Sequence, residues 1–164
     1  SGRERNAELA AELLHAALAR RGLLNELDGL VPVPMSRLRR WQRPCDHAEV
    51  LAAALVRRTG IPLLRAVRRI RHTPSQTRVT SRQQRFENVR GCFGPAPGAA
   101  AQIAGRRVCI VDNLLATGAT AHEVSKILRG LGARTVHAAV ICRTVLAGDV
   151  QAVSGDPGLA GRAD

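Results

Sequence analysis

The sequence lacks tyrosine altogether, and its only aromatic residues among 164 positions are Trp41, Phe86 and Phe93. A platform that stacks the bases of single-stranded nucleic acid ordinarily needs several aromatic rings, so this composition disfavours one. The core must instead be built from alanine, valine, leucine and isoleucine. That is feasible because 45% of the residues are hydrophobic and the chain is long enough for one domain with a sizeable core.

Long apolar runs and paired cysteine motifs are also missing. No segment is long and apolar enough to predict a membrane span. The four cysteines form no Cys-x-x-Cys pair, which argues against a zinc ribbon or a redox pair: Cys45, Cys92, Cys109 and Cys142. Cys45, Asp46 and His47 are adjacent, but we interpret them as a helix start rather than as metal ligands. We therefore expect a cytoplasmic protein with reduced cysteines and no metal held by side chains alone.

Acidic residues are scarce in one third of the chain. Residues 31–90 contain 14 arginines against three acids, a net charge of +11 out of +12 for the whole chain. Such a concentration of positive charge attracts polyanions, either nucleic acid or a multiply phosphorylated substrate.

The most informative stretch that is present covers residues 108–120, Val-Cys-Ile-Val-Asp-Asn-Leu-Leu-Ala-Thr-Gly-Ala-Thr. Its first four residues have the composition of a buried strand, and Asp112 and Asn113 follow at the carboxyl end of that strand. Small residues then form a turn into an amphipathic helix. Such a turn directs backbone N–H groups and the positive helix end toward one point. The pattern predicts a site for a sugar phosphate, with Asp112 at the sugar hydroxyls.

The same residues also allow a simpler interpretation. Thr120 and Glu123 fit a capping box, Thr-x-x-Glu, which stabilises a helix start without any ligand. The strand, Asp112 and the Thr-Gly-x-Thr series together favour the phosphate site.

Hydrophobic periodicity predicts an α/β fold with a parallel sheet flanked by helices on both faces. Helices are expected over residues 3–21, 46–59 and 120–131, and strands over residues 30–33, 63–67, 91–94, 108–111 and 135–141. In the first helix the expected apolar stripe is Leu9, Leu13, Leu14 and Leu18. Residues 71–90 are interpreted as a long polar loop and residues 95–104 as a flexible stretch. As domains, we expect a helical segment at 1–29, the α/β domain at 30–146 and a flexible tail at 147–164.

Residues 108–120 resemble the ribose-phosphate motif of type I phosphoribosyltransferases. In that motif two acidic residues bind ribose hydroxyls and a Thr-Thr-Gly-x-Thr loop binds the 5′-phosphate. The resemblance implies that the chain binds phosphoribosyl pyrophosphate (PRPP) together with Mg²⁺ held through PRPP. The chain departs from the motif twice, with Asn113 in place of the second acid and Ala116 in place of the first loop threonine.

Further segments are similar to ComF-type proteins, which carry a phosphoribosyltransferase domain and are associated with competence, the uptake of single-stranded DNA. The segments are Val-Pro-Val-Pro at 31–34, Arg-His-Thr-Pro-Ser-Gln-Thr at 71–77 and Asn-Val-Arg-Gly at 88–91. With the phosphate motif they cover roughly residues 30–143. The chain departs from that family at 35–36, where a histidine is usual, and at 43–47. It also lacks the cysteine-rich zinc ribbon. The three departures near the expected ligand, at 35–36, 43–47 and 113–116, point to an altered substrate or to lost catalysis.

The resemblance implies roles for individual residues. Asp112 and Asn113 are the expected catalytic residues, with Asp112 stabilising a cationic ribose as a nitrogen nucleophile displaces pyrophosphate. The expected substrate-binding residues are Ala116, Thr117, Gly118, Ala119 and Thr120 at the 5′-phosphate, Arg37 at the pyrophosphate, and Thr73, Gln76 and Arg78 on a lid formed by residues 71–90.

Three functions remain open on this evidence. The chain is a phosphoribosyltransferase of nucleotide metabolism, a single-stranded DNA-binding protein on the same fold, or a PRPP sensor without turnover. The acceptor base and self-association into a homodimer also stay open.

Overall fold

The computed structural model describes residues 2–35, 46–71, 82–115 and 118–143. In these residues a parallel sheet has the strand order β1-β4-β5, formed by β1 (Gly29–Pro32), β4 (Arg107–Leu115) and β5 (Thr135–Arg143). A second, antiparallel sheet pairs β2 (Val67–Arg69) with β3 (Phe93–Pro95). The parallel sheet and its helices confirm the predicted α/β class.

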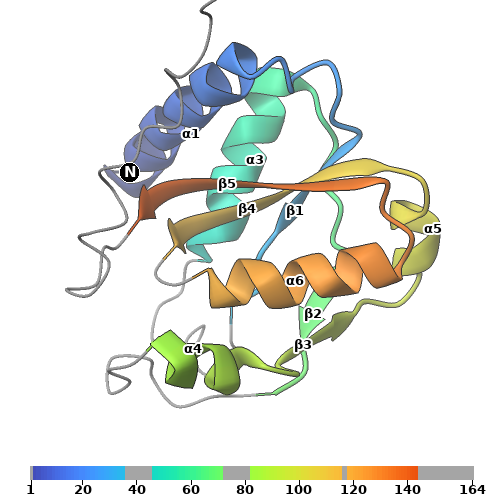
Figure 1. Ribbon diagram of the computed structural model, residues 1–164. Coiled ribbons are helices and arrows are strands. Elements are labelled where there is room, and N and C mark those ends of the chain that lie inside the picture. The colour runs from blue at the N-terminus through green and yellow to red at the C-terminus, as the bar shows by residue number, and fades with distance from the viewer. Residues whose placement is uncertain (1, 36–45, 72–81, 116–117, 144–164) are drawn as a thin grey trace, which may run out of the picture.

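Helices cover both faces of the parallel sheet. Figure 1 shows α1 (Gly2–Arg20) and α3 (His47–Thr59) on one face and α6 (Ala119–Gly130) on the other. Two shorter helices, α4 (Arg82–Val89) and α5 (Ala99–Ile103), complete the described elements.

Alternation along β4 divides the core into two clusters. Cys109 and Val111 are fully buried in the cluster that contains α1 and α3. Val108 and Ile110 are buried in the other cluster, which contains α6 and the small sheet. Because successive side chains of a strand point to opposite faces, a strand covered on both sides must be apolar at every position. That requirement explains the uninterrupted apolar run that predicted this strand.

Helix α3 begins and ends at the residues that the sequence predicts. The Asp46 carboxylate caps the helix through its Oδ1, which accepts from the Glu49 N–H at 3.4 Å, and Gly60 ends it with a φ of 72°. The other oxygen, Oδ2, accepts from the Met35 N–H at 3.3 Å. Asp46 therefore holds the segment after β1 beside the first turn of α3.

The apolar stripe predicted for α1 is wrong in half of its members. Ala11, Leu14 and Leu18 are buried against α3 and the sheet, whereas Leu9 and Leu13 are 61% and 60% exposed. Because Ala11 is small, the helix can pack closely with the face that carries Ala11, Leu14 and Leu18 turned inward. A prediction based on the positions of leucines alone does not identify this face.

Two segments expected to lack regular structure contain helices. Residues 82–89 of the predicted loop form α4, where Val89 is fully buried, and residues 99–103 of the predicted flexible stretch form α5, where Ile103 is fully buried. In each case buried apolar packing stabilises a short helix that has no strong period of its own. The strand expected at 63–67 is also wrong, because Leu63 makes only an isolated bridge to Leu30 and the chain then enters the small sheet at Val67.

Candidate ribose-phosphate site

Strand β4 is longer than predicted, and this places the two candidate catalytic residues inside it. The sequence places the strand end at Val111, but β5 pairs with β4 as far as Leu115↔Arg143, which keeps the backbone extended. Strand β1, by contrast, ends at Pro32 opposite Val111. Asp112 and Asn113 therefore lie just beyond the carboxyl end of β1, at the edge where open α/β sheets bind their ligands.

Asp112 and Asn113 belong to opposite faces of the sheet. Asn113 continues the series of Cys109 and Val111 on the face of α1 and α3, and Asp112 continues the series on the face of α6. The Asn113 backbone N–H donates to Asp112 Oδ1 at 2.8 Å. The Asp112 side chain is half-buried and that of Asn113 is exposed, so both are accessible to a ligand at this edge.

The start of α6 matches a phosphate-binding helix terminus. Gly118 is the N-cap with a φ of 79°, a left-handed conformation that glycine adopts without strain, and it has no side chain of its own to cap the helix. The first backbone bond within the helix runs from the His122 N–H to the Gly118 carbonyl at 2.8 Å. Ala119 is buried and Thr120 is half-buried in the first turn. The positive end of the helix therefore faces the carboxyl edge of β4.

The capping-box interpretation is wrong. Thr120 lies within α6 rather than before it. The Glu123 carboxylate is engaged elsewhere: its Oε2 accepts from the Gly91 N–H at 3.1 Å and its Oε1 from Lys126 Nζ at 3.4 Å. Glu123 thus joins α6 to the residues that follow α4 instead of closing the helix start.

Helix α4 packs beside the same helix start. The rings of Phe86 and His122 meet edge to face, with their centroids 5.9 Å apart. Together with the contact between Gly91 and Glu123, this places the second half of the segment predicted as a lid next to the first turns of α6. The remaining predicted site residues lie outside the described residues: Ala116, Thr117, Arg37, Thr73, Gln76 and Arg78.

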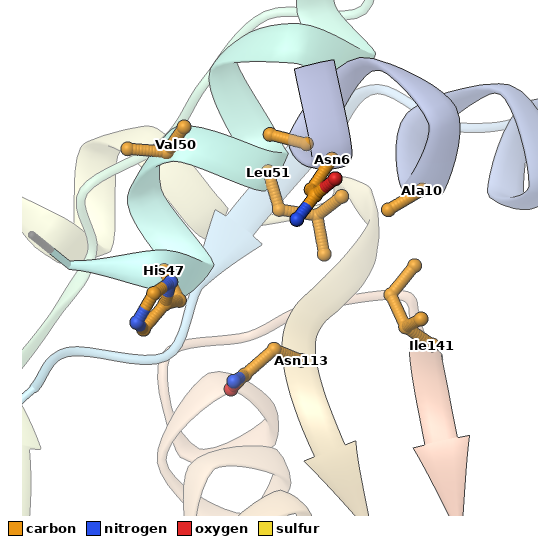
Figure 2. A pocket seen from close by; sticks show the side chains of 8 residues that line it. Asn6, Ala10, His47, Val50, Leu51, Asn113 and Ile141 are labelled. Carbon is orange, nitrogen blue, oxygen red and sulfur yellow. The ribbon is translucent and has the colours of Figure 1, made fainter. Parts of the chain in front are cut away.

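A cavity of about 310 Å³ opens beside Asn113, on the face of α1 and α3. Figure 2 shows Asn6 from α1, His47 from α3 and Asn113 from β4 around it. The other lining residues are apolar: Ala7, Ala10, Val50, Leu51 and Ile141. Sequence reasoning missed this cavity, because no local pattern indicates that Asn6 and Ile141 meet. The signal that could have placed Asn113 on the opposite face from Asp112 is the alternation of side chains along an extended strand, continued from Cys109 to Asn113.

Two other candidate chemistries find no support in this part of the chain. Burial raises the pKa of the Cys109 thiol to about 12, so it stays protonated at neutral pH and is no nucleophile. Among residues 2–35, 46–71, 82–115 and 118–143, no group of three or more histidine, cysteine or acidic side chains could hold a metal ion. No helix within these residues is long and apolar enough to cross a bilayer.

The comparison that decides the family is a match over most of the sequence. The model of the phosphoribosyl transferase domain matches residues 44–150, which include β4, the loop after it and α6. The chain belongs to this domain family. The predicted resemblance is therefore confirmed at the level of the phosphoribosyltransferase domain.

Curated relatives extend the similarity to ComF-type proteins. Competence protein F of Haemophilus influenzae is 34% identical over 110 residues, which is 66% of this chain and 47% of that protein. DNA utilization protein YhgH of Escherichia coli O157:H7 is 30% identical over 138 residues, which is 84% of this chain and 58% of that protein. The chain thus spans about half the length of these relatives.

Solved structures support the fold. The allosteric regulatory enzyme of purine biosynthesis matches 85% of this chain with a TM-score of 0.51 and 23% identity, over 25% of its own chain. Glutamine PRPP amidotransferase from B. subtilis matches 81% of this chain with a TM-score of 0.50 and 23% identity, over 26% of its own chain. At this level of identity the likeness establishes the phosphoribosyltransferase fold.

Proposed function

We propose that the chain binds PRPP, or a ribose 5-phosphate, at the carboxyl end of β4 and the start of α6, and transfers the phosphoribosyl group to a nitrogen nucleophile. The observation that carries the proposal is the pair formed by Asp112 and the α6 terminus, whose N-cap Gly118 supplies no capping side chain. A helix start of this kind suits a phosphate, and a neighbouring carboxylate suits sugar hydroxyls. Membership in the phosphoribosyltransferase domain family supports the assignment.

In this proposal the ligand lies across the end of the sheet. The loop residues Ala116 and Thr117, with Gly118, Ala119 and Thr120, bind the 5′-phosphate through backbone N–H groups and hydroxyls. Arg37 contacts the pyrophosphate as a planar fork. Thr73, Gln76 and Arg78 close over the ligand from the segment that leads into α4, which excludes water from the reacting centre.

The reaction develops positive charge on the ribose. As the bond to pyrophosphate breaks and the bond to nitrogen forms, the ribose resembles an oxocarbenium ion. The Asp112 carboxylate stabilises that cation, and Asn113 hydrogen-bonds a hydroxyl without adding charge. Only interactions that strengthen in the transition state accelerate the chemical step, so Asp112 is the residue expected to contribute most.

The described residues fit a Mg²⁺ ion that arrives with PRPP. Mg²⁺ retains several waters and is typically held by one or two carboxylates together with substrate phosphates. Asp112 is a carboxylate at this edge of the sheet, and the described residues hold no cage of three metal ligands. When bound, the ion neutralises charge on the pyrophosphate leaving group.

Calorimetric titration of Mg²⁺-PRPP tests the proposal. Wild type should saturate, and Ala121→Asp should bind at least about tenfold more weakly, because a fixed negative charge in the first turn of α6 repels the 5′-phosphate. Ser125→Asp is the matched control, one turn further along the same helix, and should bind like wild type. An acid in the first turn does not weaken a helix, so folding is preserved. Absence of saturation in wild type would overturn the proposal.

A second candidate, binding of single-stranded DNA, is favoured by the arginines around the small sheet. Arg68, Arg71 and Arg90 are exposed there. The curated relatives are named for competence and DNA utilization. Contacts to DNA phosphates release counterions, so affinity should fall steeply with salt, and the slope should fall in Arg68→Ala/Arg71→Ala and in Arg37→Ala/Arg39→Ala/Arg40→Ala. An unchanged slope in both variants would assign these arginines to solubility.

A further inference from the structure

We propose that the chain binds a second copy of itself through the outer edge of β5 and the outward side of α1. This surface, the α1/β5 face, is defined by Leu9 and Leu13 of α1 together with residues 135–141 of β5. The proposal does not depend on the ribose-phosphate site. It is carried by an open strand edge, by exposed apolar side chains beside that edge and by the low charge of both elements.

Strand β5 lies at the edge of the parallel sheet. It pairs with β4 on one side, and among residues 2–35, 46–71, 82–115 and 118–143 no strand pairs with its other side. Proteins usually protect such an edge with proline, lysine or another charge, or with a bulge. The sequence of β5 contains no proline and no lysine, its only arginine is its last residue, and its register with β4 is constant. The edge is therefore suited to pairing with a further strand.

Exposed apolar side chains lie beside this edge. Of the four large apolar side chains that are exposed in the described part of the chain, three belong to α1 and β5: Leu9, Leu13 and Ile141. Leu9 and Leu13 lie one turn apart on α1, and Ile141 lines the same cavity as Ala7 and Ala10, so the two elements are neighbours. Exposed apolar side chains that gather in one place are typical of an interaction surface.

The distribution of charge favours a second copy as the occupant. Helix α1 contains three arginines and three glutamates, and β5 contains one arginine, whereas residues 31–90 carry a net charge of +11. Figure 1 shows the small sheet and α4 at the other end of the molecule from α1. Two copies of so basic a chain repel each other least where neither carries excess charge. A polyanion, by contrast, would bind the arginine-rich end.

The α1/β5 face is also complementary to itself. A strand edge pairs with an identical edge in antiparallel orientation about a two-fold axis, the commonest symmetry of protein dimers. Because this axis is perpendicular to the joined sheet, both α1 helices lie on the same side of it, where Leu9 and Leu13 of the two copies can meet. Helix α1 is about 28 Å long and β5 about 30 Å. These lengths match a patch of about 800 Å², the area that each partner buries in a standard interface.

Each copy has its own two core clusters, so the folded monomer exists before it associates. We therefore expect a dimer in the micromolar range, and below its dissociation constant unfolding is that of the monomer. Sedimentation equilibrium of the full chain from about 1 to 100 µM should give twice the mass of one chain at the upper end. The dimer should tighten at about 0.5 M salt, because salt screens the repulsion between two basic chains. Association through a bound polyanion would weaken instead.

Two variants connect the dimer with the α1/β5 face. Leu13→Arg and Ala138→Lys each place a charge near its symmetry mate, so each should raise the dissociation constant at least about tenfold. Leu13 and Ala138 are exposed, and arginine forms helices about as well as leucine, so the monomer should fold as before. Ile70→Arg is the matched control, because it adds the same charge at the exposed apolar residue outside this face and should dimerise like wild type.

Hydrogen exchange identifies what pairs with β5. In wild type the amides of residues 135–141 should exchange more slowly as the protein concentration rises, and Leu13→Arg should remove this dependence. A monomer at every concentration would overturn the proposal, and slow exchange along β5 in that monomer would assign the edge to another segment of the same chain. A dimer that Leu13→Arg and Ala138→Lys both leave intact would place the interface elsewhere and would overturn the proposal as well.

Discussion

The two ends of β4 are built in different ways. At the amino end, Asp28 Oδ2 accepts from the Arg107 backbone N–H at 2.8 Å and from its Nε at 3.2 Å, and the Asp28 N–H donates to the Arg107 carbonyl at 2.7 Å. Asp28, just before β1, and Arg107, the first residue of β4, are thus joined by both backbone and side-chain hydrogen bonds. At the carboxyl end, Asp112 and Asn113 extend past β1 toward the cavity and the start of α6.

This difference indicates how stability and chemistry are distributed along one strand. The amino end uses its carboxylate to fix the register of two strands, whereas the carboxylate of the carboxyl end is the one that we propose to bind a ligand. The apolar middle, buried on both faces, connects them. Substitutions at the three places should therefore have separable effects: on folding in the middle, on ligand affinity and rate at the carboxyl end, and on the pH dependence of folding at the amino end.

The largest effect is expected in the two core clusters that cover the middle of β4, where α3 and α6 pack on its two faces. Leu55 and Leu128 are fully buried, one in each core cluster. Leu55→Ala and Leu128→Ala should each lower the free energy of unfolding by about 2–5 kcal/mol, because each leaves a cavity that the surroundings fill only partly. Urea unfolding measures the loss. Leu13→Ala is the control, since that side chain is 60% exposed and the change should stay within about 0.5 kcal/mol. A small loss in only one of the buried variants would show that its cluster is not part of the cooperative core.

The next effect distinguishes the two carboxylates. Asp112→Asn should weaken the binding of Mg²⁺-PRPP about 10- to 100-fold, because a hydrogen bond to a charged group contributes about 1.5–3 kcal/mol. Isothermal calorimetry measures the affinity. Asp28→Asn makes the same chemical change at the other end of the sheet and should leave the affinity unaltered. If the two variants bind PRPP equally well, Asp112 does not contact the ribose and the assigned division of the strand is wrong.

A smaller effect is expected at Asn113, where the family motif has an acid. Asn113→Asp adds a charge beside the developing ribose cation, and this charge should favour the transition state more than the ground state. PRPP-dependent turnover should rise about fivefold, as expected for a gain of about 1 kcal/mol, while PRPP affinity changes much less. Pyrophosphate release measures the turnover. If wild type binds PRPP without turnover and the variant stays inactive, catalysis was lost at more than one position, and the sensor function replaces the transferase.

Most of the parallel sheet and its long helices could be predicted from the sequence, because their signals are local. The apolar run at 108–111, the cap at Asp46 and the stop at Gly60 each act within a few residues, and each is found in the structure. Helices α4 and α5 could not be predicted. In α4 Val89 is fully buried, and in α5 Ala99 and Ile103 are buried in a cluster whose other members come from distant parts of the chain.

Part of the placement of the candidate site in the fold could also be predicted. The order of Asp112, Gly118 and Thr120 along the chain predicted a strand followed by a helix start, although β4 continues to Leu115 instead of ending at Val111. The cavity beside the strand end could not be predicted. Its residues Asn6, His47 and Ile141 come together with Asn113 only through the packing of α1 and α3 on the sheet. The hydrogen bond that the Glu123 carboxylate accepts from Gly91 could not be predicted from a local pattern either, because the two residues are 32 positions apart.

The smallest effect concerns the amino end of β4 and appears in the pH dependence of stability. The hydrogen bonds from Arg107 hold the pKa of Asp28 below its usual value of 3.8. A carboxylate with a lowered pKa in the folded state contributes stability that is fully present above the pKa of the unfolded state, and this contribution is lost as the pH falls through the folded-state pKa.

Urea midpoints of wild type should therefore exceed those of Asp28→Asn by a constant amount between about pH 5 and 8, and the difference should shrink below about pH 4. Glu26→Gln makes the same charge change near Arg107 without removing these hydrogen bonds, so its difference from wild type should be smaller. A constant difference between wild type and Asp28→Asn down to pH 2 would show that Asp28 fixes the register through geometry alone, and the contrast between the two carboxylates would then lie only in what each one contacts.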